Sequence, residues 1–484
     1  MPTRHSCATA ATRLLQPAFL LAALSAAFGM VGRGAAAPLP ILAAAAPVLS
    51  GESQARPAEA LPFADAVDQL TIALFTHAKF DPADAAGRTL VIDPLIDHTS
   101  GNQLMATQAM EPRMARMVNE RFGGTKTQPF NPENPADQPL TQGLLIQAPL
   151  TQAVATRAME PHMVRLVGER FGAIKLQPFN VESLADQPLI LMGSIAPVSA
   201  PGVHPFTTAP TQTYRMWAVI ADLRTRRIIS HESVWVRADQ VDLTPTPFFR
   251  DSPAWLVDHS QDAYLKTCAG HPGDAMDPAY VEGLPAAATI AGGIKAYEDG
   301  HYGEALAAYV RARSQPTGRQ LRVYNGLYLA NAALKRDLAA EQAFGDVVDY
   351  GLQHGKLVVK FLSRPSSTQF WPDRAVSGFY PMWLRQIAAR TAAQPACVRL
   401  VGHSSATGSA PRNAALSAAR ASRVRNDLIS RVPSLSRQTD AVGRGSAELL
   451  VGSGRDDATD VLDRRVEFET RPCPQVNADA LKPM

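Results

Sequence analysis

The chain has few cysteines and little net charge, and both shortages argue against whole classes of function. Only 4 of its 484 residues are cysteine, and no two form a Cys-x-x-Cys pair, so the ligand spacing of zinc ribbons and thioredoxin-type redox sites is missing. Its 47 basic and 44 acidic residues give a formal net charge of +3, without a dense run of Lys or Arg. Because nucleic acid usually requires a basic face, we expect no nucleic-acid partner.

Signatures of enzymes and metal sites are also missing. The sequence has no His-Glu-x-x-His motif and no glycine-rich phosphate loop, and its histidines are scattered. The run Gly402-His403-Ser404-Ser405 begins like a nucleophile elbow, but position 406 is alanine where the closing glycine should stand. We therefore expect no catalytic residues, no metal and no cofactor.

Long apolar runs are limited to the first residues of the chain. Arg4 and Arg13 precede an apolar run over residues 14–31, and the small residues 35–37 follow it. This order is typical of a secretory signal peptide, which we place at residues 1–37. A membrane anchor is the alternative, since about 18 apolar residues can just span a bilayer. Residues 38–60 are rich in Ala and Pro and predict a flexible linker. No later run is long enough to cross a membrane, so the protein should be soluble once the leader is removed.

Hydrophobic spacing predicts an α+β fold class. The chain should form several domains, because 484 residues are too many for one compact core. Residues 61–243 predict a mixed αβ domain. It should hold a helix over 63–80, strands at 89–93 and 189–197, and a hairpin of strands 214–222 and 228–236.

This domain contains an internal duplication with a period of 49 residues. Residues 103–140 align without gaps with residues 152–189, and 25 of the 38 positions are identical. Each copy predicts a helix followed by a strand around Gln-Pro-Phe-Asn, at 128–131 and 177–180. Met110, Met114 and Met117 share one helical face. Packing of this face on a sheet is favoured over an adaptable methionine-lined groove.

The second copy and the strands after it contain the segments ATRAMEPHMVRLVGERF, PLILMGSI and YRMWAVIADLRTRRIISHESVWV. In this order they resemble the periplasmic αβ domains of the FlgO, CsgG and LpoB type, from which the extra copy is a departure. The resemblance implies a partner-binding module of the cell envelope. We therefore expect this domain to recruit an envelope protein whose identity the sequence does not give.

Two further segments lie in the middle of the chain. Residues 244–285 hold six prolines and predict an irregular connector, whose aromatic residues Phe248, Phe249 and Trp255 should pack on a neighbouring domain. Residues 286–352 predict helices, with small and aromatic residues at a spacing similar to that of tetratricopeptide repeats. About one and a half repeats cannot bury their faces alone, so a helical spacer is favoured over a peptide-binding groove.

Residues 353–472 predict a small α/β sandwich with the element order βαβαββ, and residues 473–484 predict a tail. Strands are expected at 356–361, 398–403, 441–445 and 464–470, and helices at 381–391 and 413–432.

Four motifs occur in this last region in a fixed order. They are Gly402-His403-Ser404-Ser405-x-x-Gly408, Asn413-x-x-Leu416-Ser417-x-x-Arg420-Ala421-x-x-Val424, Gly443-x-Gly445 and Asp463-Arg464-Arg465-Val466-Glu467-Phe468. Together they resemble the OmpA-like peptidoglycan-binding domain. The resemblance implies a non-enzymatic protein of the Gram-negative envelope, in the periplasm or at the outer membrane. Its ligand would be the diaminopimelate of the peptidoglycan stem peptide.

The resemblance also implies roles for single residues. Arg420 occupies the place of the arginine that grips a carboxylate, and Ser405 that of the aspartate that pairs with the ammonium group. His403, Asn413 and Arg465 would give supporting contacts, while Asp463 replaces the usual asparagine. For Arg465, a surface ion pair is an almost equally favoured alternative.

Loss of the charge at position 405 leaves two interpretations open. A charge-assisted hydrogen bond contributes about 1.5–3 kcal/mol and a neutral one about 1 kcal/mol, so the serine weakens binding by roughly tenfold or more. One alternative is that Asp456 or Asp457 supplies the missing charge. The other is a protein-interaction scaffold whose OmpA-like domain no longer binds peptidoglycan; a wall-acting hydrolase is a distant third.

Cys397 begins the second strand of this region and Cys473 follows the last strand. In the family fold these strands are antiparallel neighbours, so the resemblance implies a disulfide between Cys397 and Cys473. Such a bond fits an oxidising compartment. Two unpaired thiols are the alternative.

Overall fold

A computed structural model describes residues 60–78, 88–122, 174–198, 213–364, 366–449 and 463–473. All of them belong to one compact unit that spans residues 49–484. The predicted leader, nearly all of the linker, the helix of the second duplicated copy, Asp456 and Asp457 lie outside the described residues.

The first sheet carries the predicted hairpin and strands. Its strands are β1 (Thr89–Ile92), β2 (Ile96–Asp97), β3 (Lys175–Leu176), β4 (Leu189–Val198), β5 (Thr213–Asp222) and β6 (Arg227–Arg237). The order is β3-β1-β4-β5-β6, with β2 also paired to β4. The pairs made by β1 and β2 are parallel, whereas β4, β5 and β6 are antiparallel neighbours.

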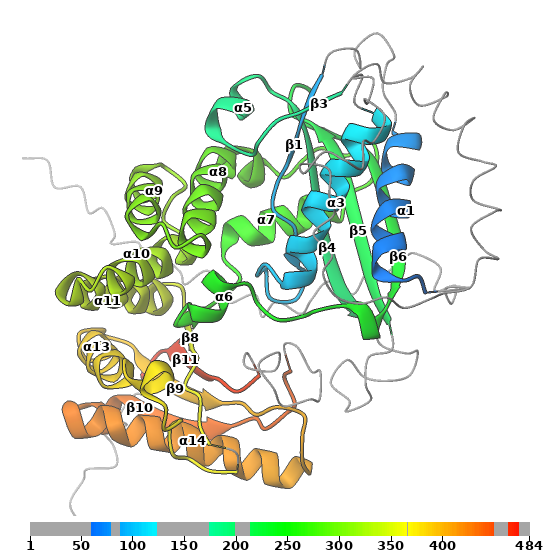
Figure 1. Ribbon diagram of the computed structural model, residues 1–484. Helices are drawn as coiled ribbons and strands as arrows, with labels where there is room; N and C mark the ends of the chain where they lie inside the picture. The colour runs from blue at the N-terminus through cyan, green and yellow to red at the C-terminus, as the bar shows by residue number, and fades with distance from the viewer. Residues whose placement is uncertain are drawn as a thin grey trace, which may run out of the picture. The chain divides into compact units, whose positions relative to one another are not determined.

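Helices cover both faces of this sheet, because side chains alternate along each strand. Leu189 and Leu191 of β4 share a core with α1 (Phe63–Thr76) and α3 (Met105–Phe122), which lie over one face of the sheet in Figure 1. Ile190 and Met192 instead share a core with α7 (His259–Cys268) and α8 (Pro278–Glu298). The methionine face of α3 therefore packs on a sheet, as the favoured interpretation predicts.

The strand predicted around Gln-Pro-Phe-Asn of the second copy is present, but it lies just before the motif and does not include it. The strand β3 ends at Leu176, just before this motif, and α5 (Val181–Ala185) begins just after it. Pro178 has no main-chain N–H to donate to a sheet. Asn180 caps α5, since its side-chain oxygen accepts a hydrogen bond of 2.8 Å from the main-chain nitrogen of Ser183. The corresponding motif of the first copy lies outside the described residues.

The irregular connector predicted for residues 244–285 is wrong, because most of it is regular structure. It contains α6 (Pro247–Asp251), the strand β7 (Ala254–Trp255), α7 and the start of α8, and a 3-10 turn (Ala238–Gln240) lies just before it. Pro247 and Pro278 occupy the first turns of their helices, where proline is tolerated because the N–H has no partner in the helix. These prolines start helices instead of interrupting them.

Helices α9 (Tyr302–Ser314), α10 (Leu321–Ala333) and α11 (Asp337–Gln353) follow α8. The ring of Tyr309 lies between Gly293 of α8 and Gly326 of α10. A Cβ atom on Gly293 would lie 2.9 Å from this ring, and one on Gly326 would collide with it. Small residues thus allow three helices to approach closely around one buried aromatic ring.

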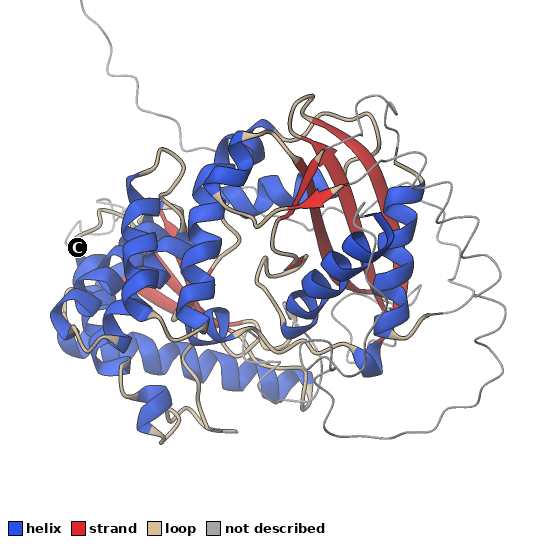
Figure 2. Cartoon of the chain, turned by 45° about the horizontal axis from the view of Figure 1, so that its top comes forward, coloured by secondary structure: helices blue, strands red, loops and turns tan. Residues whose placement is uncertain are grey.

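The last region has the predicted order of strands and helices. It comprises β8 (Lys356–Val359), α12 (Arg374–Ser377), α13 (Tyr380–Ala392), β9 (Cys397–Gly402), α14 (Ala410–Arg431), α15 (Leu435–Gln438), β10 (Thr439–Gly443) and β11 (Val466–Arg471). The sheet order is β10-β9-β11-β8-β7, in which only β9 and β10 are parallel. Figures 1 and 2 show the long helix α14 lying along this sheet. The edge strand β7 comes from the segment predicted to be irregular.

One hydrophobic core joins the helical segment to this second sheet. It includes Phe344 of α11, Trp383 of α13 and Leu400 of β9. The rings of Phe344 and Trp383 are stacked with centroids 5.4 Å apart. Among the residues that the structure describes, no helix is both long and apolar enough to cross a membrane.

Candidate functional site

The four motifs of the last region meet at one end of the second sheet. After β9, the main-chain nitrogen of His403 donates to the carbonyl of Arg465 (3.0 Å), and that of Ser404 to the carbonyl of Gly445 (2.9 Å). The main-chain nitrogen of Gly445 donates to Ser417 Oγ on α14 (2.8 Å). Segments as far apart in the sequence as His403 and Arg465 therefore form one loop cluster beside α14.

Two motif glycines are required by this helix. A Cβ atom on Gly402 would collide with the carbonyl of Ser417, and one on Gly443 would collide with the main chain of Ala418. Gly445 also has a positive φ of 58°, which favours glycine. The glycines of β9 and β10 therefore bring α14 close to the sheet and so place its polar face at the loop cluster.

Ser405 and Asn413 lie together in this cluster. Asn413 Nδ2 donates to the carbonyl of Ser405 (3.3 Å), and Ser405 Oγ is 3.3 Å from Thr407 Oγ1. Both side chains are buried. Asn413 thus holds the loop that carries Ser405, which is a positioning contact.

Arg420 lies two helical turns after Asn413 on the same buried face of α14, roughly 10 Å farther along the axis. Its guanidinium group is held by main-chain oxygens of the loop after β8. Nε donates to the carbonyl of Ser367 (3.1 Å) and Nη2 to that of Arg364 (3.2 Å). Those acceptors are neutral, so the positive charge of Arg420 faces carbonyl dipoles at these two contacts.

His403 and Arg465 form a different group around Glu467. Arg465 Nε donates to Glu467 Oε1 (2.7 Å), and Lys356 Nζ is 2.7 Å from Glu467 Oε2. His403 Nε2 lies 3.5 Å from Glu467 Oε1. Burial alone would raise the pKa of Glu467, but the contacts with His403, Arg465 and Lys356 hold it below its ordinary value. Burial also lowers the pKa of His403.

Alternation along β11 separates this group from α14. Val466 and Phe468 share a core with Val424 of α14, so the side chains of Arg465 and Glu467 point to the opposite face. The structure thus brings Ser405 and Asn413 together and places Arg420 on the same helix as Asn413. It places His403 and Arg465 in a buried ionic cluster on the other face. Arg465 makes an ion pair, as its alternative interpretation has it, but the pair is buried and not at the surface.

The predicted site left out Glu467, Lys356 and the loop that holds Arg420. Glu467 follows Arg465 by two residues, and side chains at this spacing lie on the same face of a strand. Their opposite charges could therefore have predicted the contact from the sequence. The loop contact depends on the turn after β8 and carries no such signal.

The Sγ atoms of Cys397 and Cys473 are bonded, with the Cα atoms 4.8 Å apart. The bond ties the residues after β11 to the start of β9, where Arg471 is the register partner of Cys397. Cys268 is buried and free. Within the described ranges, no three His, Cys, Asp or Glu side chains form a group that could hold a metal ion.

No family model matches the chain, and no curated protein matches it. Several solved structures are similar to about a quarter of it. The cell wall anchor of the T6SS from Pseudomonas aeruginosa is 24% identical over 24% of this chain and 80% of that one, with a TM-score of 0.21. The periplasmic domain of Helicobacter pylori MotB is 16% identical over 27% and 85%, with a TM-score of 0.20. The peptidoglycan-associated lipoprotein from Burkholderia pseudomallei is 23% identical over 23% and 87%, with a TM-score of 0.19.

Proposed function

We propose that residues 353–472 bind peptidoglycan and that residues 61–243 recruit an envelope protein to it. The protein would act without catalysis in the Gram-negative envelope, in the periplasm or at the outer membrane. The observation that supports this most is the convergence of the four motif segments at one end of the second sheet, beside α14. That arrangement is what a binding site assembled from these motifs requires.

Arg420 is the residue proposed to grip a carboxylate of diaminopimelate. A guanidinium group offers planar donors that match two carboxylate oxygens. At present two of its nitrogens donate to the carbonyls of Arg364 and Ser367. These bonds are charge-assisted because the donor is ionised, but a carboxylate adds an ionised acceptor with two oxygens that match the planar fork, so it should compete favourably with the carbonyls. The loop would hold the side chain in place until the ligand arrives.

Binding of the full chain to purified sacculi tests this proposal. We expect Arg420→Ala to lower the bound fraction at least tenfold, and Arg420→Lys to lower it as well, because lysine keeps the charge but loses the planar fork. Arg431→Ala is a matched control on the same helix, since Arg431 is exposed and donates to the main-chain carbonyl of Asp427. Equal binding of Arg420→Ala and Arg431→Ala, with both proteins folded by circular dichroism, would contradict the proposal.

Ser405→Asp is the complementary change. An aspartate would restore an opposite charge for the ammonium group of the ligand, so we expect binding to sacculi to strengthen several-fold. The increase should disappear in the double variant with Arg420→Ala if both residues hold the same ligand. Unchanged or weaker binding of a folded Ser405→Asp protein would show that position 405 does not face an ammonium group.

A scaffold without affinity for peptidoglycan is the second candidate. Arg465 favours it, because this predicted contact residue is buried in an ion pair with Glu467 and so has a structural role. Charge contacts weaken strongly as the salt concentration rises from about 50 to about 200 mM. If the wild-type protein does not sediment with sacculi at any concentration in this range, the scaffold is the better assignment.

A further inference from the structure

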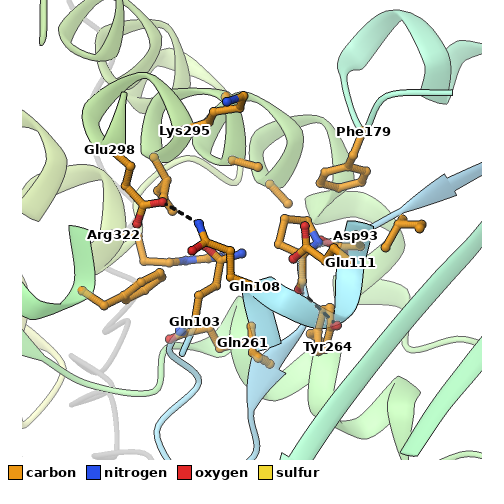
Figure 3. A pocket seen from close by; sticks show the side chains of 18 of the residues that line it. Asp93, Gln103, Gln108, Glu111, Phe179, Gln261, Tyr264, Lys295, Glu298 and Arg322 are labelled. Carbon is orange, nitrogen blue, oxygen red and sulfur yellow. Dashed lines mark hydrogen bonds between the residues drawn. The ribbon is translucent and has the colours of Figure 1, made fainter. Parts of the chain in front are cut away.

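A cavity of 1120 Å³ lies where α3, α8 and α10 approach the end of β1, far in sequence from the motifs of the last region. Such a volume is slightly larger than that of ordinary ligand pockets, which occupy about 300–1,000 Å³. Small and apolar side chains make up much of the wall, including Pro112, Ala115, Phe179, Gly283, Ala287 and Ala291. Figure 3 shows polar side chains from several elements around the same space.

Five carboxyl groups belong to this wall, and neutral groups donate to three of them, Asp93, Glu111 and Glu298. Glu111 Oε1 accepts from the main-chain nitrogen of Leu95 (3.0 Å). Asp93 Oδ2 accepts from the hydroxyl of Tyr280 (2.6 Å). Glu298 accepts from Gln108 Nε2 at 3.0 Å, the contact drawn in Figure 3, and from the main-chain nitrogen of Phe248 at 3.3 Å.

The cationic side chains of the wall each have a hydrogen-bond or ion-pair partner other than Asp93, Glu111 and Glu298, and one of these partners, Asp299, also lines the cavity. Lys295 Nζ is 2.8 Å from Asp299 on the exposed side of α8, and Arg250 Nε is 3.0 Å from Asp251. Arg322 Nη2 donates to Gln320 Oε1 (2.7 Å), although its charge also lowers the pKa of Asp93.

Burial consequently raises the pKa of two of these carboxyl groups, that of Asp93 to about 7 and that of Glu111 to about 8. Asp93 and Glu298 raise the pKa of Glu111 further by repulsion. A buried carboxylate that lacks a nearby counter-charge is costly, and a cation placed beside it removes that cost.

We infer that this cavity binds an organic cation, with an ammonium or guanidinium group between Glu111 and Glu298 and an aliphatic chain along α8. The acidic groups supply the counter-charge, and the small side chains of α8 supply a smooth apolar wall for the chain. A free amine and a basic side chain of a peptide share this chemistry. The inference concerns a different part of the protein from the proposed peptidoglycan site and does not depend on it.

Binding should release protons, so the affinity should rise between about pH 6 and pH 8. The titratable and charged groups that face Glu111 across the cavity come from every element of its wall: Asp93, Asp242, Arg250, Tyr264, Tyr280, Lys295, Glu298, Asp299 and Arg322. The two tyrosines have raised pKa values because of burial, so they stay neutral over this range.

Calorimetric titration of the full chain can test the inference. The probes are 1,5-diaminopentane and the capped peptide Ala-Lys-Ala, and the capped peptide Ala-norleucine-Ala provides the same chain without charge. We expect at least one cation to bind at least tenfold more tightly than the norleucine peptide. Binding of the diamine alone would assign a free amine, and binding of the lysine peptide alone would assign a protein segment.

Matched variants locate the site. Glu111→Gln and Glu298→Gln each keep an acceptor oxygen but remove a charge, so each should weaken cation binding at least tenfold. Glu120→Gln removes an exposed carboxylate from the same helix α3 and should leave binding unchanged. Ala287→Trp should block the cavity without breaking a hydrogen bond. The inference is overturned if neither cation binds better than the norleucine peptide, or if Ala287→Trp and both Gln variants bind like the wild type.

Discussion

Buried and half-buried charged residues of this protein differ in whether a counter-charge reaches them. Glu467 has Arg465 and Lys356 within 2.7 Å, and its pKa is lowered. Glu111 accepts from a main-chain nitrogen, and its pKa is raised. The first arrangement belongs to a structural ionic cluster, whereas the second leaves a charge for a ligand to satisfy.

Glu467→Gln should destabilise the protein strongly. The change removes the charge that pairs with Arg465 and Lys356, and breaking a buried ion pair costs about 3–5 kcal/mol. Urea denaturation measures this loss. Glu341→Gln is the matched control, because Glu341 pairs with the exposed Arg385 and such a pair contributes at most about 1 kcal/mol. Equal losses in the two variants would show that the Glu467 cluster is not a stabilising unit.

Glu111 should make stability depend on pH. Its pKa is about 8 in the folded protein against an ordinary value of 4.5, so the folded state binds more protons than the unfolded state between these values. Its contribution is therefore complete below about pH 4.5 and is lost as the pH rises through 8. We expect Glu111→Gln to flatten the fall of the thermal midpoint between pH 5 and pH 8. An unchanged slope would mean that Glu111 ionises normally.

At the scale of the elements, close packing decided several features that local sequence signals did not. Pro247 and Pro278 begin helices in a segment whose proline content predicts a loop. Tyr309 fills the space between two helices because Gly293 and Gly326 have no side chains there. The spacing of small and aromatic residues predicted the helices, but it did not predict which residues contact each other.

Gly326→Ala should therefore be destabilising although alanine favours helices. Its Cβ atom would collide with the ring of Tyr309, and overpacking of a core costs about 1–3 kcal/mol. Gly292→Ala on α8 is the control, since a Cβ atom there meets nothing within 4 Å. It should stabilise by about 0.5–1 kcal/mol through helix propensity. Denaturation midpoints of the two variants should move in opposite directions, and a shift in the same direction would contradict the packing argument.

At the scale of the whole described unit, the helical segment and the second sheet share one hydrophobic core. The stack of Phe344 on Trp383 links α11 to α13, and β7 pairs with β8 from outside the predicted domain boundary. A shared core of this kind makes the two regions unfold together.

Phe344→Ala should consequently lower protection in the second sheet, although Phe344 lies outside it. Truncation of a buried phenylalanine costs about 3–5 kcal/mol. Hydrogen exchange, followed by mass spectrometry on a peptide covering residues 397–402, measures the effect. Leu338→Ala on the same helix is the control, because Leu338 is 86% exposed. Unchanged exchange in β9 of the Phe344 variant would show that the two regions are independent.

Much of the fold follows from local pattern. The alternation of apolar residues predicted β4, β5 and β6, and the spacing of Leu384, Ile387 and Ala388 predicted α13, because each pattern has one stable way to bury its face. The prolines of residues 244–285 and the Gln-Pro-Phe-Asn motif gave inaccurate predictions of secondary structure, because proline and asparagine occur at the starts of helices as well as in loops.

Some features of the candidate sites likewise follow from the sequence, whereas others depend on the tertiary structure. The sequence by itself determined the motif residues and the order of the elements that carry them, because glycine spacing and periodicity are local properties. Only the tertiary structure decided that Lys356 pairs with Glu467, that main-chain carbonyls hold Arg420, and that Asp93, Glu111 and Glu298 share a cavity. These contacts join residues from different elements, so their charges and distances exist only once the chain has packed.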